Sequence, residues 1–249
     1  MRPFEAIIFD LGSTLIYFEG DWSEIMYRAS KVLYQQLDQA GLKLDQKHFL
    51  REYHQAVNAY YQERESEFIE HTTHFILRNL LAEWGYPEVP DQILRHALKA
   101  MYAVSQSHWH PEPDAVPILK ALQERGYRLG LISNAADDKD VQTLVDKAEI
   151  RSFFDKILTS AGEGIRKPNP QIFQKLLDYW DLLPTQAAMV GDTLGADILG
   201  AKNAGIFSIW ITRRADTPAN HAHGDTIHPD ATIDALNELP GLLDQLAVQ

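Results

Sequence analysis

Four short apolar segments constrain the fold of this 249-residue chain more than any other feature. They cover residues 6–9, 128–132, 187–190 and 206–211, and small or polar residues follow the first three. Short, uninterrupted aliphatic segments of this kind are typical of strands that are buried on both faces of a parallel sheet. The sequence therefore predicts a parallel sheet whose strands come from widely separated parts of the chain.

Helical patterns lie between these segments. Residues 115–125 form one pattern, which Gly126 closes, and residues 170–180 form another, which Asn169 is placed to cap. Alternating strands and helices predict an α/β fold with a Rossmann-like parallel sheet core that is flanked by helices. Ligands of such sheets bind beyond the carboxyl ends of the strands, so the residues that follow each strand are the candidates for function.

Residues 17–110 have a different character, with helical periodicity and little that resembles a strand. The candidate helices of this region cover residues 23–40, 46–61, 67–84 and 91–104. We predict that residues 17–110 form an inserted α-helical cap domain and that residues 1–16 and 111–249 form the α/β catalytic core. Residues 213–229 are predicted to be a polar loop without a functional signal, before a final helix-like segment.

The composition favours a small-molecule partner. A formal net charge of -12, from 23 basic and 35 acidic residues, argues against a nucleic-acid surface, which needs clustered Lys and Arg. The negative field repels anions, so a phosphate site must be neutralised locally by a lysine, a cation or backbone amides. The absence of cysteine excludes disulfides, thiolate metal sites and a cysteine nucleophile.

The chain also lacks the features of a membrane or secreted protein. The apolar stretch at residues 6–9 is too short for a secretory signal, and no later run approaches the about 18 apolar residues of a membrane span. We expect a cytoplasmic protein, a monomer or a homodimer, with neither a nucleic acid nor a membrane as partner.

Asp10 ends the first apolar segment and opens the motif Asp-Leu-Gly-Ser-Thr-Leu. An ionised carboxylate can attack phosphorus directly and form an acyl phosphate, so it needs no base to activate it. It does need a divalent cation and a lysine to neutralise the anionic phosphate as the two approach each other. Considered alone, this segment is also compatible with an aspartate that merely caps a turn.

Two further signals follow along the chain. Ser133 and Asn134 come directly after a predicted strand, where a hydroxyl and successive backbone amides can grip phosphate oxygens. An ordinary turn or helix cap is the alternative for this pair. Lys167 lies just before a helix start at Pro170, so its ammonium can share an anion with the positive end of that helix. The alternative for Lys167 is a solvated surface lysine.

A pair of acids follows the third apolar segment. Asp192 comes after Gly191, and Asp197 lies near the start of the next helix. Magnesium prefers oxygen ligands and retains waters, so Asp10 and Asp192 with one backbone carbonyl, substrate phosphate and water would complete an octahedron. The alternative for Asp197 is a charge at a helix N-terminus.

These signals, in this order and with a helical insertion after the first, resemble the haloacid dehalogenase (HAD) superfamily of aspartate-nucleophile hydrolases. The resemblance covers nearly the whole chain. It implies a role for each motif residue: catalytic Asp10 and Lys167, substrate-binding Ser133, Asn134 and Lys167, the Mg²⁺ ligands Asp10, Asp192 and the carbonyl of Gly12, and Asp197 as support for the metal shell.

Gly12 departs from the usual pattern. Phosphatases that this chain resembles usually carry a second aspartate two positions after the nucleophile, followed by glycine, whereas this chain has Gly12 and Ser13. The missing residue protonates the leaving alkoxide and then activates water, work that accelerates a reaction by about 100- to 10,000-fold. We predict a magnesium-dependent hydrolase of small phosphorylated metabolites, with an aspartyl-phosphate intermediate on Asp10, that borrows an acid or uses good leaving groups.

Two alternatives stay open. The dehalogenase branch of the superfamily also lacks the second aspartate, but it attacks carbon and needs no metal, so the pair Asp192 and Asp197 argues against it. The chain could also be a non-catalytic phosphate-ligand binding protein on the same fold, although a binding protein has no need for a nucleophile at Asp10.

The cap is expected to select the substrate, because caps of this family close over the site and exclude water. Tyr17, Phe18 and Trp22, near the first junction with the core, are candidates to face the site. His71 and His74 are more typical of ordinary helix residues than of catalytic ones.

Overall fold

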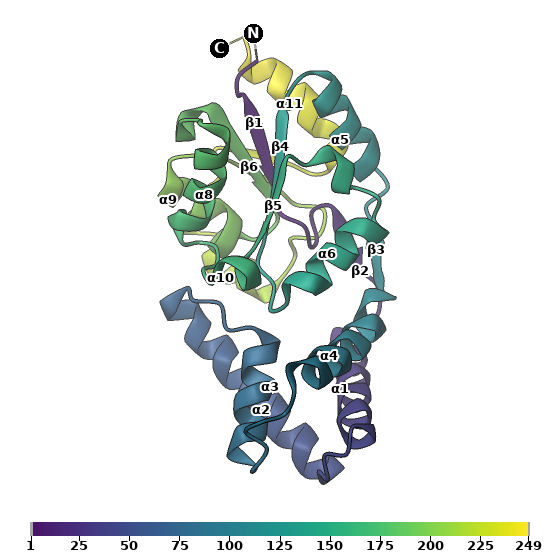
Figure 1. Cartoon of the computed structure of the whole chain (residues 1–249). Coiled ribbons are helices and arrows are strands. Elements are labelled where there is room, and N and C mark those ends of the chain that lie inside the picture. The colour runs from purple at the N-terminus through teal and green to yellow at the C-terminus, as the bar shows by residue number, and fades with distance from the viewer. Residues whose placement is uncertain (1, 249) are drawn as a thin grey trace.

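The computed structural model describes residues 2–248, apart from the side chains of residues 65–67. Its core is a six-stranded parallel sheet in the order β5-β4-β1-β6-β7-β8 (Figure 1). The strands are β1 (Ala6–Phe9), β4 (Arg128–Ser133), β5 (Lys156–Thr159), β6 (Ala187–Gly191), β7 (Phe207–Ile211) and β8 (Ala231–Ile233). The predicted α/β fold with a Rossmann-like parallel sheet is confirmed.

Helices cover both faces of this sheet (Figure 1). One layer contains α5 (Ala115–Glu124), α6 (Asp138–Lys147) and α11 (Leu239–Leu246), and the other contains α8 (Pro170–Trp180) and α9 (Leu199–Ala204). Successive side chains of a strand point to opposite faces. Ile7 and Phe9 therefore pack in the first layer, whereas Ala6 and Ile8 pack in the second. Burial on both faces explains why the strands are continuously apolar.

Gly130 allows α8 to lie close against the middle of β4. A Cβ atom at this position would lie 2.5 Å from Cη2 of Trp180 and 2.6 Å from Cδ2 of Leu176. Such distances are far inside van der Waals contact, so any side chain here would push the helix away from the sheet.

Four helices lie together beyond the carboxyl ends of the strands (Figure 1). They are α1 (Trp22–Gln39), α2 (Gln46–Glu67), α3 (Thr73–Glu83) and α4 (Asp91–Gln106), and we call them the helical unit. They enclose an apolar cluster of their own, which includes Leu33, Phe49 and Leu77. An antiparallel ribbon of β2 (Ile16–Phe18) and β3 (Trp109–Pro111) joins the unit to the core.

The predicted boundary between the second and third helices is wrong. α2 continues to Glu67, and α3 begins only at Thr73. Phe68 ends α2 in the left-handed conformation with φ 54°, and Ile69 then forms an antiparallel bridge with Ile165 of the core. Pairing with the core thus overrides the helical pattern between the two helices.

The prediction of a polar loop over residues 213–229 is also wrong, because α10 (Pro218–His223) lies within it. Thr217 caps this helix by accepting a hydrogen bond from the backbone N–H of Asn220, and Pro218 occupies the first turn. Thr-Pro is a recognised helix start, so the signal was present in the sequence. Strands β2, β3, β5 and β8 were not predicted, because they are as short as β1 but lack its uninterrupted apolar sequence.

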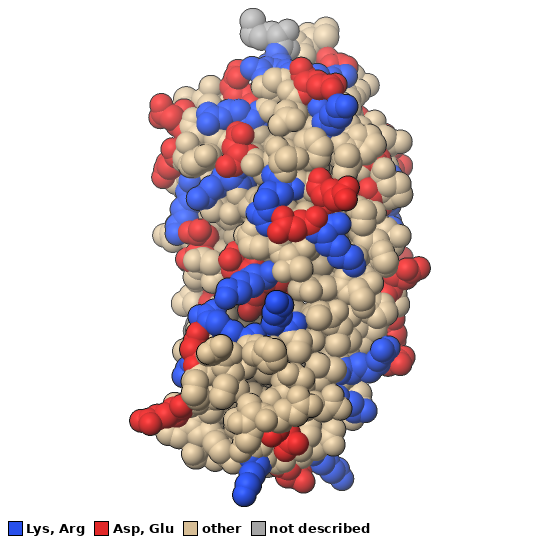
Figure 2. Space-filling view, turned by 45° about the vertical axis from the view of Figure 1, so that its right-hand side comes forward, with Lys and Arg blue, Asp and Glu red and all other residues tan. Residues whose placement is uncertain are grey.

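The surface agrees with the charge balance of the sequence. On the face in Figure 2, Lys and Arg side chains are interspersed with Asp and Glu and form no continuous basic stripe among the described residues. Within residues 2–248, no helix has both the length and the hydrophobicity that crossing a bilayer requires.

Candidate active site

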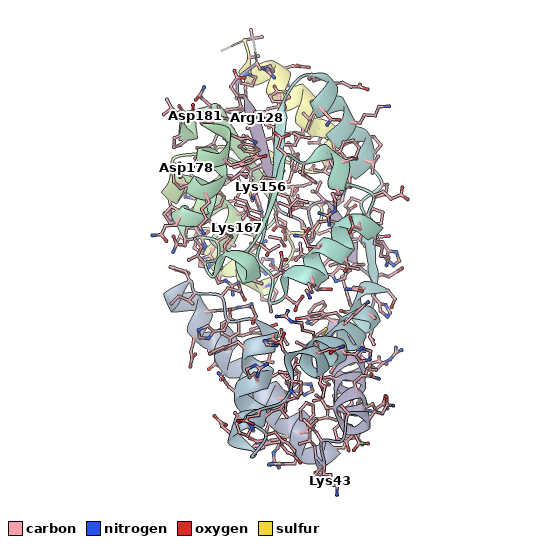
Figure 3. The ribbon with its side chains drawn as sticks, in the orientation of Figure 1. Lys43, Arg128, Lys156, Lys167, Asp178 and Asp181 are labelled. Carbon is pink, nitrogen blue, oxygen red and sulfur yellow. The ribbon has the colours of Figure 1, made fainter. Side chains whose placement is uncertain are left out.

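Lys167 lies at the centre of the predicted site. Its Nζ is 2.6 Å from Oδ1 of Asp10 and 2.6 Å from Oδ1 of Asp197, and it donates a 2.7 Å hydrogen bond to the carbonyl of Ile132. The side chain is only 1% exposed, so it is not a solvated surface lysine. Figure 3 places Lys167 at the end of the sheet that faces the helical unit, whereas Lys43 lies at the far tip of that unit.

Asp10, Asp192 and Asp197 form a buried carboxylate cluster. Each offers an oxygen that lies within 4.8 Å of the others. The sheet explains the proximity, because β1 and β6 are neighbours and the N–H of Asp10 donates to the carbonyl of Val190 at 2.9 Å. The cluster thus contains three of the residues that were predicted from motifs far apart in the sequence.

Gly191 makes room for Asp197. A Cβ on this glycine would lie 2.3 Å from Cγ of Asp197. The Asp197 side chain is fixed further by the backbone N–H of Thr193, which donates to its Oδ2 at 2.9 Å. Thr193 directly precedes the π-helical turn Leu194–Ile198, which contains Asp197. Gly191 therefore allows the Asp197 side chain to pack against the backbone that precedes Asp192.

Burial controls the titration of the cluster. It raises the pKa of Asp10 to about 6, although Lys167 acts in the opposite direction. Burial, then the charges of Asp10 and Asp197, raise the pKa of Asp192 to about 8. Burial alone would lower the pKa of Lys167, but the two carboxylates outweigh it and raise that pKa, so the ammonium stays charged. Three carboxyls around one ammonium leave excess negative charge, which a divalent cation would offset.

Ser133 is the last residue of β4, one residue beyond the predicted strand, and Asn134 follows it, but the surroundings of the two differ. Ser133 is buried at the end of the strand, beside Thr159 of β5. The Asn134 side chain binds the backbone of Lys167 at both ends: Nδ2 donates to the carbonyl and Oδ1 accepts from the N–H, each at 2.9 Å. Asn134 therefore positions the lysine, and its contact with substrate stays a prediction.

The loop after Asp10 has an unusual conformation. Ser13 adopts the left-handed conformation with φ 60°, at the position where the resembling phosphatases have glycine. A Cβ on Gly12 would lie 3.4 Å from Cη2 of Trp109, a residue of β3. Thr14 donates a long, 3.5 Å hydrogen bond to Oδ1 of Asp192. An indole ring thus borders the position of the missing second aspartate.

Asn220 and Trp210 were not predicted to belong to the site. Asn220 Nδ2 and Trp210 Nε1 both donate to the backbone carbonyl of Asp192, each at 2.8 Å. The Oδ1 of Asn220 accepts from the N–H of Leu194 at 2.8 Å. Asn220 therefore holds the chain on both sides of Thr193. The helix start before Asn220 was readable in the sequence, but its contact with Asp192 was not.

Glu70 links the helical unit to the core near the site. Its side chain is 1% exposed and accepts hydrogen bonds from the hydroxyls of Tyr60 at 2.6 Å and Ser160 at 2.7 Å. Ser160 Oγ in turn accepts from the N–H of Ala135 at 2.9 Å, and Arg166 lies 3.7 Å from Glu70. Glu70 therefore contacts Arg166, which directly precedes the buried lysine, and it reaches the loop that follows Ser133 through Ser160.

Comparison with known proteins identifies the family. A family model described as haloacid dehalogenase-like hydrolase matches residues 4–205. A glyceraldehyde 3-phosphate phosphatase of Pyrococcus furiosus is 29% identical over 99% of this chain and 94% of its own length. Another glyceraldehyde 3-phosphate phosphatase, of Methanothermobacter thermautotrophicus, is 30% identical over 96% of this chain and 99% of its own.

Solved structures of a dehalogenase and of a phosphatase share the fold. A 2-haloacid dehalogenase of Pseudomonas syringae is 23% identical, covers 97% of this chain and 99% of its own, and has a TM-score of 0.69. A HAD phosphatase of Thermococcus onnurineus is 21% identical, covers 96% of this chain and 97% of its own, and has a TM-score of 0.62. At these identities the likeness shows the fold alone. The chain belongs to the haloacid dehalogenase-like hydrolases, as its motifs predict, and the curated relatives that span nearly all of its length are phosphatases of that family.

Proposed function

We propose that the chain is a magnesium-dependent phosphatase that hydrolyses small phosphorylated metabolites through an aspartyl-phosphate on Asp10. The observation that carries the proposal is the contact of Asp10 with the buried ammonium of Lys167, inside a cluster of three carboxylates. A buried lysine beside a buried carboxylate is costly to maintain, and anionic phosphoryl transfer gives this arrangement a use.

The donor set fits Mg²⁺. All the candidate ligands are oxygen atoms, and the three carboxyls of Asp10, Asp192 and Asp197 lie around the single ammonium of Lys167. Asp10, Asp192 and the carbonyl of Gly12 would hold the ion, and Asp197 would support it. When bound, the ion offsets the charge of the phosphate and of the carboxylates.

The chain's own residues account for the bond changes. A carboxylate oxygen of Asp10 forms a bond to phosphorus, and the ester oxygen leaves with the electron pair of the broken P–O bond. Lys167 holds Asp10 and the phosphoryl group together, and Ser133 binds a phosphate oxygen. Water then attacks the acyl phosphate at phosphorus, which releases inorganic phosphate and restores Asp10.

Residues 17–110 are proposed to act as the cap that closes over the substrate. The contacts of Glu70 with the core support this role, because they join the helical unit to Ser160 and to Arg166, the residue before Lys167. The names of the relatives support a small phosphorylated substrate: besides the glyceraldehyde 3-phosphate phosphatases, a phosphoserine phosphatase of Thermus thermophilus is 36% identical over 41% of this chain.

The test is hydrolysis of an aryl phosphate with and without magnesium. The wild type should hydrolyse the aryl phosphate with Mg²⁺ and lose this activity when a chelator is added. Asp10→Asn should abolish hydrolysis. Asp181→Asn is the matched control. Asp181 is exposed, and its backbone has the left-handed conformation, which Asn adopts readily. Failure to hydrolyse any of a panel of phosphate esters would refute the proposal.

The same assay separates the two alternatives. Chloride release from a haloacid in the presence of a chelator would identify a dehalogenase. Tight phosphate-ligand binding that is unchanged in Asp10→Asn, without turnover, would identify a binding protein. Burial of Asp192 and Asp197 beside Asp10 favours the phosphatase, because carbon chemistry needs no cation site.

A further inference from the structure

An aromatic cluster lies at the junction of the helical unit and the core. It consists of Phe18 on β2, Trp22 at the start of α1 and Trp109 on β3. The rings of Phe18 and Trp109 are 5.3 Å apart across the ribbon, and Trp22 packs edge-on against Phe18 at 4.8 Å. Trp22 is 48% exposed, and the other two are partly exposed. The aromatic cluster therefore presents accessible aromatic surface.

The ring of Trp109 stands where a side chain at position 12 would point. A Cβ on Gly12 would lie 3.4 Å from Cη2 and 3.8 Å from Cζ3 of this indole. Gly12 lies two residues after Asp10, at the position where the phosphatases that this chain resembles carry the acid that protonates the leaving group. The indole therefore borders the place from which that acid would project, on the loop that carries Asp10.

Chemistry limits what such a site can release. The clustered carboxyls of Asp10, Asp192 and Asp197 surround one ammonium, and position 12 offers no acid. No acid at position 12 can therefore protonate the leaving oxygen as it departs. A phenol has a pKa of about 10, as in the tyrosine side chain, whereas an alkoxide is nearly as basic as hydroxide, whose conjugate acid, water, has a pKa of about 15.7. A phenolate therefore leaves without a proton far more readily than an alkoxide.

We propose that the aromatic cluster is the leaving-group subsite and that the preferred substrates are phosphate monoesters with a planar aromatic leaving group. The proposal rests on the phosphatase function proposed above. As the bond from Asp10 to phosphorus forms, the bond from phosphorus to the aryl oxygen breaks, and the phenolate takes its proton from solvent. The leaving ring stacks on Trp109 at the offset or edge-on spacings that aromatic pairs prefer.

The first test uses the wild type alone. kcat/KM is measured with Mg²⁺ for substituted phenyl phosphates of graded leaving-group pKa and for two alkyl phosphates, glycerol 3-phosphate and glyceraldehyde 3-phosphate. Without a general acid, log kcat/KM should fall steeply as leaving-group pKa rises, and the alkyl esters should react at least about 100-fold more slowly than phenyl phosphate. A flat dependence, or an alkyl ester that matches phenyl phosphate, would overturn the proposal.

The second test removes the ring. Trp109→Leu keeps an apolar side chain, and Trp84→Leu is its control, because Trp84 stacks on His48 in the helical unit and not in the aromatic cluster. Trp109→Leu should lower kcat/KM for phenyl phosphate by about 2- to 10-fold, with little change for the alkyl esters. The control should leave the ratio of aryl to alkyl kcat/KM unchanged.

The outcomes separate this inference from the proposed function. Turnover that prefers alkyl phosphates, or equal losses for both ester classes in Trp109→Leu, would overturn the aromatic subsite and leave the phosphatase standing. Absence of turnover with every ester would refute both proposals together.

Discussion

At the scale of single residues, Ser13 has a backbone conformation that its side chain disfavours. Its φ of 60° lies in the left-handed region, which glycine enters without steric cost. We expect Ser13→Gly to raise the free energy of unfolding by about 0.5–1 kcal/mol, since relief of the strain exceeds the entropy that glycine adds to the unfolded chain. Urea denaturation measures the change. Ser152→Gly, at an exposed residue of ordinary conformation, should instead destabilise, and the reverse order would contradict the account.

Gly12 gives a second prediction at this scale. Gly12→Asp alone should not increase alkyl phosphate hydrolysis, because the new Cβ would already be in van der Waals contact with the indole of Trp109, which limits the room for the carboxyl. Combining it with Trp109→Ala should raise kcat/KM for glycerol phosphate by about 10-fold or more over Trp109→Ala alone, since a positioned acid contributes about 100-fold or more when well placed. If the single Gly12→Asp variant already hydrolyses the alkyl ester faster than the wild type, the indole ring of Trp109 moves aside for the new carboxyl.

The motif residues were predictable, and their partners were not. Asp10 and Asp192 follow apolar strands, and that pattern is visible in a single sequence. Trp109 and Asn220 reach the site from positions far along the chain, through the β2–β3 ribbon and through α10. Such contacts depend on how the elements pack, which local sequence patterns do not specify. Lys167 was singled out from its motif, but its burial beside two carboxylates was a finding of the structure.

At the scale of elements, the segment between α2 and α3 is the contact through which the helical unit reaches the catalytic loops. Glu70→Gln replaces a carboxylate oxygen with an amide, which cannot accept from both Tyr60 and Ser160. We expect a loss of about 1–3 kcal/mol in the free energy of unfolding, because a buried donor is left without its acceptor. We also expect a higher KM for phenyl phosphate. Glu83→Gln, on an exposed position of α3, is the control, and equal effects would contradict the role of Glu70.

Elements with a clear apolar or helical pattern were predicted more accurately than those whose bounds depend on contacts with the rest of the chain. The sheet strands of the four apolar segments and helices α1, α5 and α8 lie within a residue or two of their predicted bounds. The errors fall where tertiary contacts decide the conformation, at residues 68–72 and in α10. A helical pattern continues through residues 68–72, yet the bridge from Ile69 to Ile165 holds this stretch against the core.

At the scale of the whole molecule, a titrating group lies at a second contact between the helical unit and the core. Asp140 on α6 is partly buried and accepts a 2.8 Å hydrogen bond from Gln106 at the end of α4. Burial raises its pKa to about 7 from an ordinary value of 3.8, although the Gln106 hydrogen bond acts in the opposite direction. The folded protein therefore binds more protons than the unfolded chain between these two values. The stability that Asp140 contributes is complete below the lower value and is lost as the pH rises to about 7.

Asp140→Asn removes this titration and keeps a neutral acceptor for Gln106. Relative to the wild type, the variant should gain about 1–3 kcal/mol in the free energy of unfolding between about pH 4 and pH 8, a modest value because the carboxyl keeps some solvent. Urea denaturation across this range measures the difference. Asp178→Asn, at an exposed residue of α8, should show no such trend, and a flat difference for Asp140→Asn would refute the assignment.

The proposed mechanism depends on a covalent bond between phosphorus and a carboxylate oxygen of Asp10. A chain without the second aspartate also lacks the base that would activate water, so the acyl phosphate should form quickly from 4-nitrophenyl phosphate and break down slowly. The most direct measurement is an acid quench during this turnover, followed by peptide mass spectrometry. We expect an initial burst of nitrophenol and a phosphate adduct on the peptide that carries Asp10, and we expect the adduct to be absent in Asp10→Asn. Sustained hydrolysis without that adduct, or an adduct on another residue, would contradict the proposed mechanism.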